Sequence, residues 1–288
     1  RCGPTWCVTA RSPSVDLMAA ASETTSTPDG GLWDAHVHVF GRDARVQAGH
    51  YQPQHFPLER IEAEAAACGV QHLVLVQPSV YGTDNTVMLD ALASRPGRHR
   101  GVAVVDGGVS DAELDRMHTL GVRGVRFNRV SPVGNGPAAF HALAPRLRER
   151  GWHVQWYAAP QHLAEIAALH EAAGIPCVLD HLAGMHAGLA EDDPAWSHLA
   201  ALAGQGAWVK LSGWYRLNCR PPYAALHGAI RRVAALAPGR LVWGSDWPHT
   251  AFAPDALPAY ASVWQPVAEA LVPHQAAAAR RDAARLYA

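Results

Sequence analysis

The chain has 288 residues, of which 49% are hydrophobic and 17% charged, and its formal net charge is −1. This suits one large globular domain, and the near-neutral charge gives no reason to expect nucleic acid or an anionic membrane as a partner. No apolar run is long enough to span a bilayer. The five cysteines are scattered, without disulfide-framework or zinc-ribbon spacing, which favours a reducing compartment, the cytoplasm.

The first 30 residues differ in composition from the rest of the chain. Thr, Ser, Ala, Pro and Gly dominate there, without a hydrophobic period or the apolar core of a secretory signal. We therefore predict a disordered leader over residues 1–30, followed by one folded domain over residues 31–288.

From residue 32 onward, apolar runs rich in β-formers alternate with helical patterns. Most of the runs are continuously apolar, as is typical of strands covered on both faces. Strands are predicted over residues 32–39, 72–78, 101–105, 124–127, 153–157, 176–181, 208–212 and 241–244. Helices are predicted over residues 57–68, 110–121, 161–173, 194–203, 223–237, 256–271 and 274–287. Ser110 and Glu113 form a capping box at the start of the second of these helices.

Eight strand–helix units in about 250 residues predict a single (β/α)8 TIM-type barrel. A doubly wound open sheet is the alternative. A nucleotide-binding sheet of that kind typically has a glycine-rich, phosphate-binding turn after an early strand. The first turn of this chain, Phe40-Gly41-Arg42, is not glycine-rich.

Polar and ionisable residues recur where the predicted strands end, and in a barrel all these ends open on one face. His36 and His38 are two apart on the first strand, so their imidazoles leave it on the same side. The other strand ends contribute Ser79, Thr83, Arg126, Asn128, Tyr157, Asp180, His181, Lys210, Arg216, Asp246 and His249. Because polar residues recur at one strand end after another, the pattern favours a shared site over an ordinary loop role for all of them.

Three of these segments together carry a family resemblance. Asp34-Ala35-His36-Val37-His38, Asp180-His181 and Gly244-Ser245-Asp246-Trp247-Pro248-His249 resemble the amidohydrolase-2 branch of the amidohydrolase superfamily. More narrowly, residues 77–85, 121–128, 151–157 and 178–184 are similar to the 2-pyrone-4,6-dicarboxylate lactonases. The resemblance covers residues 32–288 and implies the barrel predicted above.

The resemblance implies roles for the strand-end residues. Asp246 would be the general base that activates water, and His36, His38 and His181 would polarise a lactone carbonyl and stabilise its oxyanion. Arg126 and Arg216 would hold substrate carboxylates. The residues that would orient the ring are Tyr157, Ser79, Thr83, His249 and Asn128. Asp34 and Asp180 would orient catalytic histidines, and Lys210 is assigned no catalytic role.

The resemblance also bears on metal binding. Metal-dependent superfamily members carry a lysine or glutamate on the fourth strand or a histidine on the fifth. In this chain the position on the fourth strand is held by Arg126 or Asn128, and the position on the fifth strand by Gln155 or Tyr157. Neither pair includes the expected metal ligand, which argues against a two-metal site. We predict that no metal is required. The alternative is a single zinc held by His36, His38, His181 and Asp246.

The predicted function is that of a hydrolase that opens the ring of a small carboxylated lactone, such as 2-pyrone-4,6-dicarboxylate. Its only predicted partner is this small molecule. Three alternatives remain open: a zinc-dependent lactonase, a sugar-acid lactonase or isomerase, and a zinc-dependent decarboxylase of aromatic acids. Neither the exact lactone nor the oligomeric state follows from the sequence.

Overall fold

The computed structural model describes residues 30–47, 52–130, 135–253 and 255–288, so the predicted leader lies outside the described residues except for Gly30. At its centre is one sheet of eight parallel strands in the order β1 to β8. The strands are β1 (Leu32–Val37), β2 (Val70–Val76), β3 (Arg100–Ala103), β4 (Val122–Asn128), β5 (His153–Tyr157), β6 (Cys177–Leu179), β7 (Trp208–Leu211) and β8 (Leu241–Trp243).

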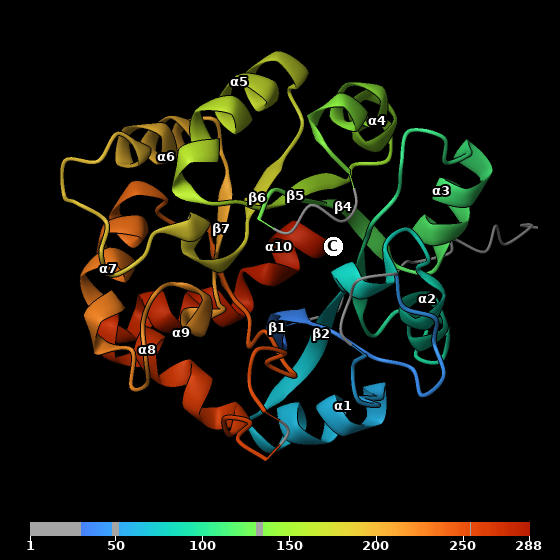
Figure 1. Cartoon of the computed structure of the whole chain (residues 1–288), viewed down its shortest axis with the longest axis horizontal. Coiled ribbons are helices and arrows are strands. Elements are labelled where there is room, and N and C mark those ends of the chain that lie inside the picture. The colour runs from blue at the N-terminus through green and yellow to red at the C-terminus, as the bar shows by residue number, and fades with distance from the viewer. Residues whose placement is uncertain (1–29, 48–51, 131–134, 254) are drawn as a thin grey trace, which may run out of the picture.

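The chain after β8 returns to β1. The His38 N–H donates to the Trp247 carbonyl at 2.8 Å, and the Asp246 N–H donates to the His36 carbonyl at 2.9 Å. These bonds bring the sheet round into a barrel with the helices outside it (Figure 1). The predicted TIM-type (β/α)8 barrel is therefore confirmed.

The helices are α1 (Leu58–Ala67), α2 (Thr86–Ala93), α3 (Asp111–Thr119), α4 (Pro137–Glu149), α5 (Leu163–Ala173), α6 (Ala195–Gly204), α7 (His227–Leu236), α8 (Gln265–Ala270), α9 (Pro273–Arg281) and α10 (Ala283–Tyr287). The predicted cap is present at α3, where the Ser110 hydroxyl accepts from the Glu113 N–H at 3.2 Å. Among the described residues, no helix is long and apolar enough to cross a membrane.

Several helix predictions need correction. Helices α2 and α4 were not predicted. The segment predicted as one helix over residues 256–271 is a short 3-10 helix (Tyr260–Trp264) followed by α8. The last predicted helix is divided at Asp282 into α9 and α10. This division lets α10 turn beneath the barrel instead of continuing along its outside.

Helix α10 covers the mouth of the barrel at which the strands begin, and Figure 1 shows it at the centre of the ring of helices. Tyr287 is fully buried there, its ring stacked on Trp33 with centroids 6.4 Å apart. The Arg100 Nε–H donates to the Tyr287 carbonyl at 2.8 Å. The opposite mouth, at the carboxyl ends of the strands, is where the polar strand-end residues gather.

Candidate active site

A pocket of about 210 Å³ opens at the carboxyl ends of the strands. Its lining combines an apolar wall with polar and cationic side chains from six different strand ends. The lining residues are His38, Phe40, Pro78, Ser79, Val80, Arg126, Asn128, Tyr157, Arg216 and Thr250. A barrel places catalytic groups at this end of its strands, so this pocket is the candidate active site.

His36 and His38 face each other at the bottom of the pocket, with their Nε2 atoms 3.3 Å apart. The Nδ1 atom of His38 lies 2.7 Å from the Val76 carbonyl, and Nδ1 of His36 lies 3.2 Å from Asp180 Oδ1. The Val76 carbonyl is an acceptor, so Nδ1 of His38 carries a proton, and the neutral His38 ring presents its Nε2 lone pair toward the pocket. Nδ1 of His36 also lies 3.4 Å from Lys210 Nζ, which can only donate, so the two contacts of this nitrogen favour opposite tautomers.

Asp246 stands opposite the histidines with its two oxygens in different surroundings. Oδ1 lies 3.5 Å from His36 Nε2, 3.4 Å from His38 Nε2 and 4.0 Å from His181 Nε2. Oδ2 accepts a 2.7 Å bond from the Tyr215 hydroxyl and a 2.8 Å bond from Arg216 Nε. One oxygen is thus anchored, and the other is turned toward the imidazoles.

The charges around Asp246 keep it ionised. Burial alone would raise its pKa, but the Arg216 guanidinium, followed by His181, outweighs burial and holds the pKa well below its usual range. Burial also lowers the pKa of His181 to about 4, against the opposing charges of Asp246 and Asp180. Burial likewise holds the pKa of His36 well below its usual range, so the site pairs the Asp246 carboxylate with neutral imidazoles at His36 and His181.

A second layer of polar groups supports the histidines from below. The Asp180 carboxylate accepts from Arg126 Nε and Gln155 Nε2, both at 3.1 Å, besides its contact with His36. The fully buried Lys210 donates to Gln155 Oε1 at 2.7 Å and lies 3.6 Å from Asp180. Burial lowers the pKa of Lys210 to about 8. These groups fix the His36 ring and one edge of Arg126.

Backbone strain is concentrated at the residues of this site. His181, Asp246 and His249 have φ angles of 48°, 60° and 63°, in the left-handed region that non-glycine residues avoid. Room for the rings is provided by glycines: a Cβ at Gly244 would lie 2.5 Å from the Cβ of His36, and one at Gly213 would overlap the His181 ring. The local chain is thus shaped around the imidazoles.

The structure brings most of the predicted site residues together. Asp246, His36, His38 and His181 converge as described, while Arg126, Arg216, Tyr157, Ser79 and Asn128 line or border the same pocket. The Arg126 and Arg216 guanidiniums lie 5.3 and 5.8 Å from the Tyr157 ring centroid. Asn128 Nδ2 donates to the Ser79 hydroxyl at 3.0 Å.

Two predicted residues are placed differently. Thr83 is exposed on the turn before α2, outside the residues that line the pocket. His249 lines a neighbouring, more apolar cavity of about 200 Å³, and its Nε2 lies 3.1 Å from the Ser245 carbonyl. Neither residue therefore lines the 210 Å³ pocket, and their predicted contact with the substrate stays a prediction.

Sequence reasoning missed three contributors: Tyr215, Gln155 and Thr250. Tyr215 holds Asp246, Gln155 links Lys210 to Asp180, and the Thr250 hydroxyl accepts from Arg216 Nη2 at 3.3 Å. The signal that could have indicated Tyr215 is its position directly before Arg216, after the seventh strand. Its bond to Asp246 joins residues 31 apart in the chain, and no local pattern indicates such a pair.

The donor set fits a single divalent cation. His36, His181 and Asp246 offer ligand atoms that all lie within 4.8 Å of one another, and His38 Nε2 is 3.4 Å from the same carboxylate oxygen. Tetrahedral ligands around zinc stand about 3.3–3.4 Å apart, given Zn–N distances of about 2.0–2.1 Å. His181 Nε2 and Asp246 Oδ1 are buried without a hydrogen-bond partner among the described residues. These are the properties expected of metal ligands.

Comparison with known proteins gives consistent matches. The amidohydrolase family profile matches residues 33–288. A 4-sulfomuconolactone hydrolase from Rhizobium radiobacter is 32% identical over 237 residues, 79% of each chain. A 2-pyrone-4,6-dicarboxylate hydrolase from Comamonas testosteroni is 32% identical over 253 residues, 82% of each chain. The crystal structure of a probable 2-pyrone-4,6-dicarboxylic acid hydrolase from Acinetobacter baumannii with citric acid bound superposes with a TM-score of 0.79 at 26% identity, covering 90% of this chain and 99% of that one.

Proposed function

This chain belongs to the amidohydrolase family, in its amidohydrolase-2 group, and from that premise we propose that it hydrolyses a small lactone that carries carboxylate groups. The observation that carries the proposal is the position of Asp246, whose free oxygen faces three histidines beneath a pocket bordered by Arg126 and Arg216.

The proposed reaction begins with water between Asp246 and the lactone carbonyl. Asp246 Oδ1 takes a proton from the water, and the water oxygen forms a bond to the carbonyl carbon. The carbonyl oxygen becomes an oxyanion, for which a histidine protonated at Nε2 is the donor. When the ring C–O bond breaks, the proton on Asp246 passes to the leaving ring oxygen. The product has one more carboxyl group than the substrate.

The arginines suit an anionic substrate. Arg126 uses Nε for Asp180, and its two terminal nitrogens, which make no hydrogen bond within the described ranges, are available to the pocket that Arg126 lines. Such a guanidinium edge binds carboxylates, and also sulfonates, through paired hydrogen bonds. Arg216 is committed to Asp246 and Thr250, so in this proposal it anchors the base first and contacts the substrate second. The citric acid in the Acinetobacter baumannii relative is a ligand of the same chemical class.

A zinc-dependent lactonase is the second candidate, and the convergence of imidazole lone pairs on Asp246 Oδ1 favours it. His36, His38, His181 and Asp246 would hold the ion, which when bound would polarise the carbonyl and lower the pKa of the attacking water. Lone pairs at 3.3–3.5 Å repel one another unless a proton or a metal ion lies between them. The metal-independent form thus needs a proton on the Nε2 atom of at least one histidine, which the neutral Nε2–H tautomer supplies, and the zinc form does not.

A panel of lactones tests the proposal. Purified protein is incubated with 2-pyrone-4,6-dicarboxylate, 4-sulfomuconolactone, a muconolactone and an aldonolactone, and ring opening is followed by proton release. We expect turnover of one of the three anionic lactones and none of the neutral aldonolactone. Preference for the aldonolactone would instead support a sugar-acid lactonase, and release of carbon dioxide from an aromatic acid would support a decarboxylase.

A further inference from the structure

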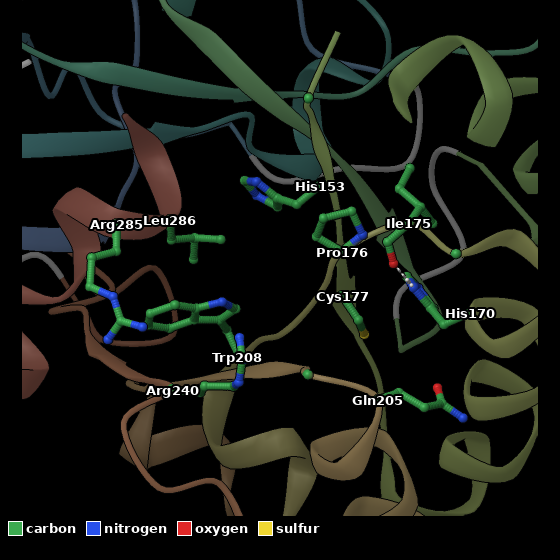
Figure 2. A pocket seen from close by; sticks show the side chains of 13 residues that line it. His153, His170, Ile175, Pro176, Cys177, Gln205, Trp208, Arg240, Arg285 and Leu286 are labelled. Carbon is green, nitrogen blue, oxygen red and sulfur yellow. Dashed lines mark hydrogen bonds between the residues drawn. The ribbon is translucent and has the colours of Figure 1, made fainter. Parts of the chain in front are cut away.

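A second cavity lies at the opposite mouth of the barrel, where the strands begin. It encloses about 460 Å³, more than the 210 Å³ pocket of the candidate active site. Its walls come from the starts of β5, β6 and β7, from the loop before β8 and from α10 (Figure 2). Nothing in the proposed lactone hydrolysis uses this cavity, since it is separated from Asp246 by the length of the strands.

The charged residues of the cavity are all cationic. Arg285 and Arg240 lie beside the Trp208 ring, with guanidinium carbons 5.3 and 5.9 Å from its centroid. Figure 2 shows the two guanidiniums on different sides of this ring. The lining contains no aspartate or glutamate. Two positive charges on one aromatic ring, without an acid in the same wall, favour an anionic ligand.

The two arginines differ in how far the protein satisfies them. Arg285 donates to the Gly239 carbonyl at 3.2 Å and lies 3.5 Å from Asp282, so it partly caps the loop before β8. Arg240 has no ion pair or side-chain hydrogen bond within the described ranges. It rests on Gly206, where an added Cβ would be 3.6 Å from the guanidinium carbon. Arg240 is therefore held in place with its donors available.

The remaining walls are mixed: His170 and Gln205 are polar, and the other side chains are largely apolar. Ile175, Pro176 and Leu286 line the cavity together with the edge of Trp208, which is only 6% exposed. His153 also lines the cavity, but it is only 2% exposed and its Nε2 atom is buried against Gly124. An apolar body with one anionic group would satisfy both kinds of wall.

We propose that this cavity is a second ligand site and that it binds an aromatic carboxylate. The carboxylate pairs with Arg240, whose donors are available, Arg285 adds a second positive charge on the other side of Trp208, and the aromatic ring lies against Pro176 and Leu286. The site is independent of the lactone pocket and does not require that the proposed hydrolase activity be correct. The alternative is that both arginines serve only to pack Trp208 and cap the neighbouring loops.

Binding of three probes tests the proposal. The probes are 2-naphthoate, its neutral isostere 2-naphthamide, and acetate, each measured by ligand-observed NMR and calorimetry. Because an aromatic carboxylate could also enter the catalytic pocket, the measurements are repeated in an Arg126→Met background. We expect 2-naphthoate to bind wild type and Arg126→Met alike, and the other two probes to bind at least tenfold more weakly.

Variants of the cavity locate the binding. Arg240→Ala and, separately, the more exposed Arg285→Ala should each weaken 2-naphthoate binding about tenfold in the Arg126→Met background. Arg232→Ala is the matched control, since Arg232 stacks on Trp196 at 4.1 Å in a different cavity that contains Glu191. Binding that disappears with Arg126→Met, or that Arg240→Ala and Arg285→Ala leave unchanged, would overturn the proposal, as would no binding at millimolar probe. Thermal melting confirms that each variant is folded.

Discussion

The two oxygens of Asp246 have separate tasks in this site. Oδ2 is held by Tyr215 and Arg216 at 2.7 and 2.8 Å, while Oδ1 faces the imidazoles without a hydrogen-bond partner among the described residues. In the proposed reaction, fixing one oxygen orients the other toward the place where water would lie between Asp246 and the carbonyl. The charge of Arg216 lowers the basicity of the carboxylate, but it also keeps the group ionised in a buried position.

Replacement of the base is the first prediction. Asp246→Asn retains the shape of the side chain but cannot accept a proton, so we expect kcat to fall by about 10²–10⁴-fold. Substrate affinity, measured by calorimetry with the lactone that wild type hydrolyses, should stay within about threefold. Asp192→Asn, at an exposed aspartate, serves as the control and should behave like wild type. Near-native turnover by Asp246→Asn would show that another group is the base.

Tyr215 gives a second prediction for the same carboxylate. Tyr215→Phe removes only the hydroxyl that donates to Asp246 Oδ2. A hydrogen bond to a charged group contributes about 1.5–3 kcal/mol, so kcat should fall roughly 10–100-fold while KM changes little. Tyr287→Phe removes another buried hydroxyl, at the opposite mouth, and should leave turnover unchanged. If KM rises instead while kcat is kept, Tyr215 contacts the substrate and does not position the base.

Helices and strands were predictable to different degrees. All eight strands were found because most of them are continuous apolar runs covered on both faces, and β5 has the predicted bounds. Helix α2 has only eight residues and directly follows the pocket loop, and α4 begins at Pro137 and contains Pro145. Prolines within a segment argue against a helix when only the sequence is available. Packing against the barrel overrides that local signal.

The loop after β7 carries a prediction at the scale of an element. Gly213 has a φ angle of 59°, and a side chain there would overlap His181. Gly213→Ala should therefore lower the melting temperature and displace His181, with kcat reduced at least tenfold in the folded fraction. Gly228→Ala is a matched control, because this exposed glycine lies in α7 with open space around its Cα. It should be neutral or stabilising by about 0.5–1 kcal/mol. Equal behaviour of the two variants would contradict the steric argument.

At the scale of the whole molecule, the barrel explains why a site could be predicted without knowing a contact. Parallel strands all end at one mouth, so polar residues after β1, β4, β5, β6 and β8 had to meet there. The face of the pocket was thus predictable, and so were most of its residues. The pairing of these residues was not predictable. Arg216 bonds Asp246, and Arg126 bonds Asp180, through side-chain geometry that the spacing of residues in the sequence does not encode.

Three of the four candidate ligands of one metal ion, His36, His181 and Asp246, come from β1, from the turn after β6 and from the turn after β8. An ion held by all three would link distant parts of the barrel and bind only the folded chain. At a zinc concentration about 100 times Kd, such binding stabilises by about 2.7 kcal/mol, which in a domain of this size raises Tm by roughly 5–10 °C. We expect this shift in wild type and in His274→Asn, which alters an exposed histidine elsewhere, but not in His36→Asn.

Turnover after chelation then distinguishes the two forms of the mechanism. Loss of both the shift and the activity indicates the zinc lactonase, whereas full activity without metal supports the predicted metal-independent reaction, with its proton on a histidine. An unshifted Tm at saturating zinc would show that the converging donors hold a proton instead.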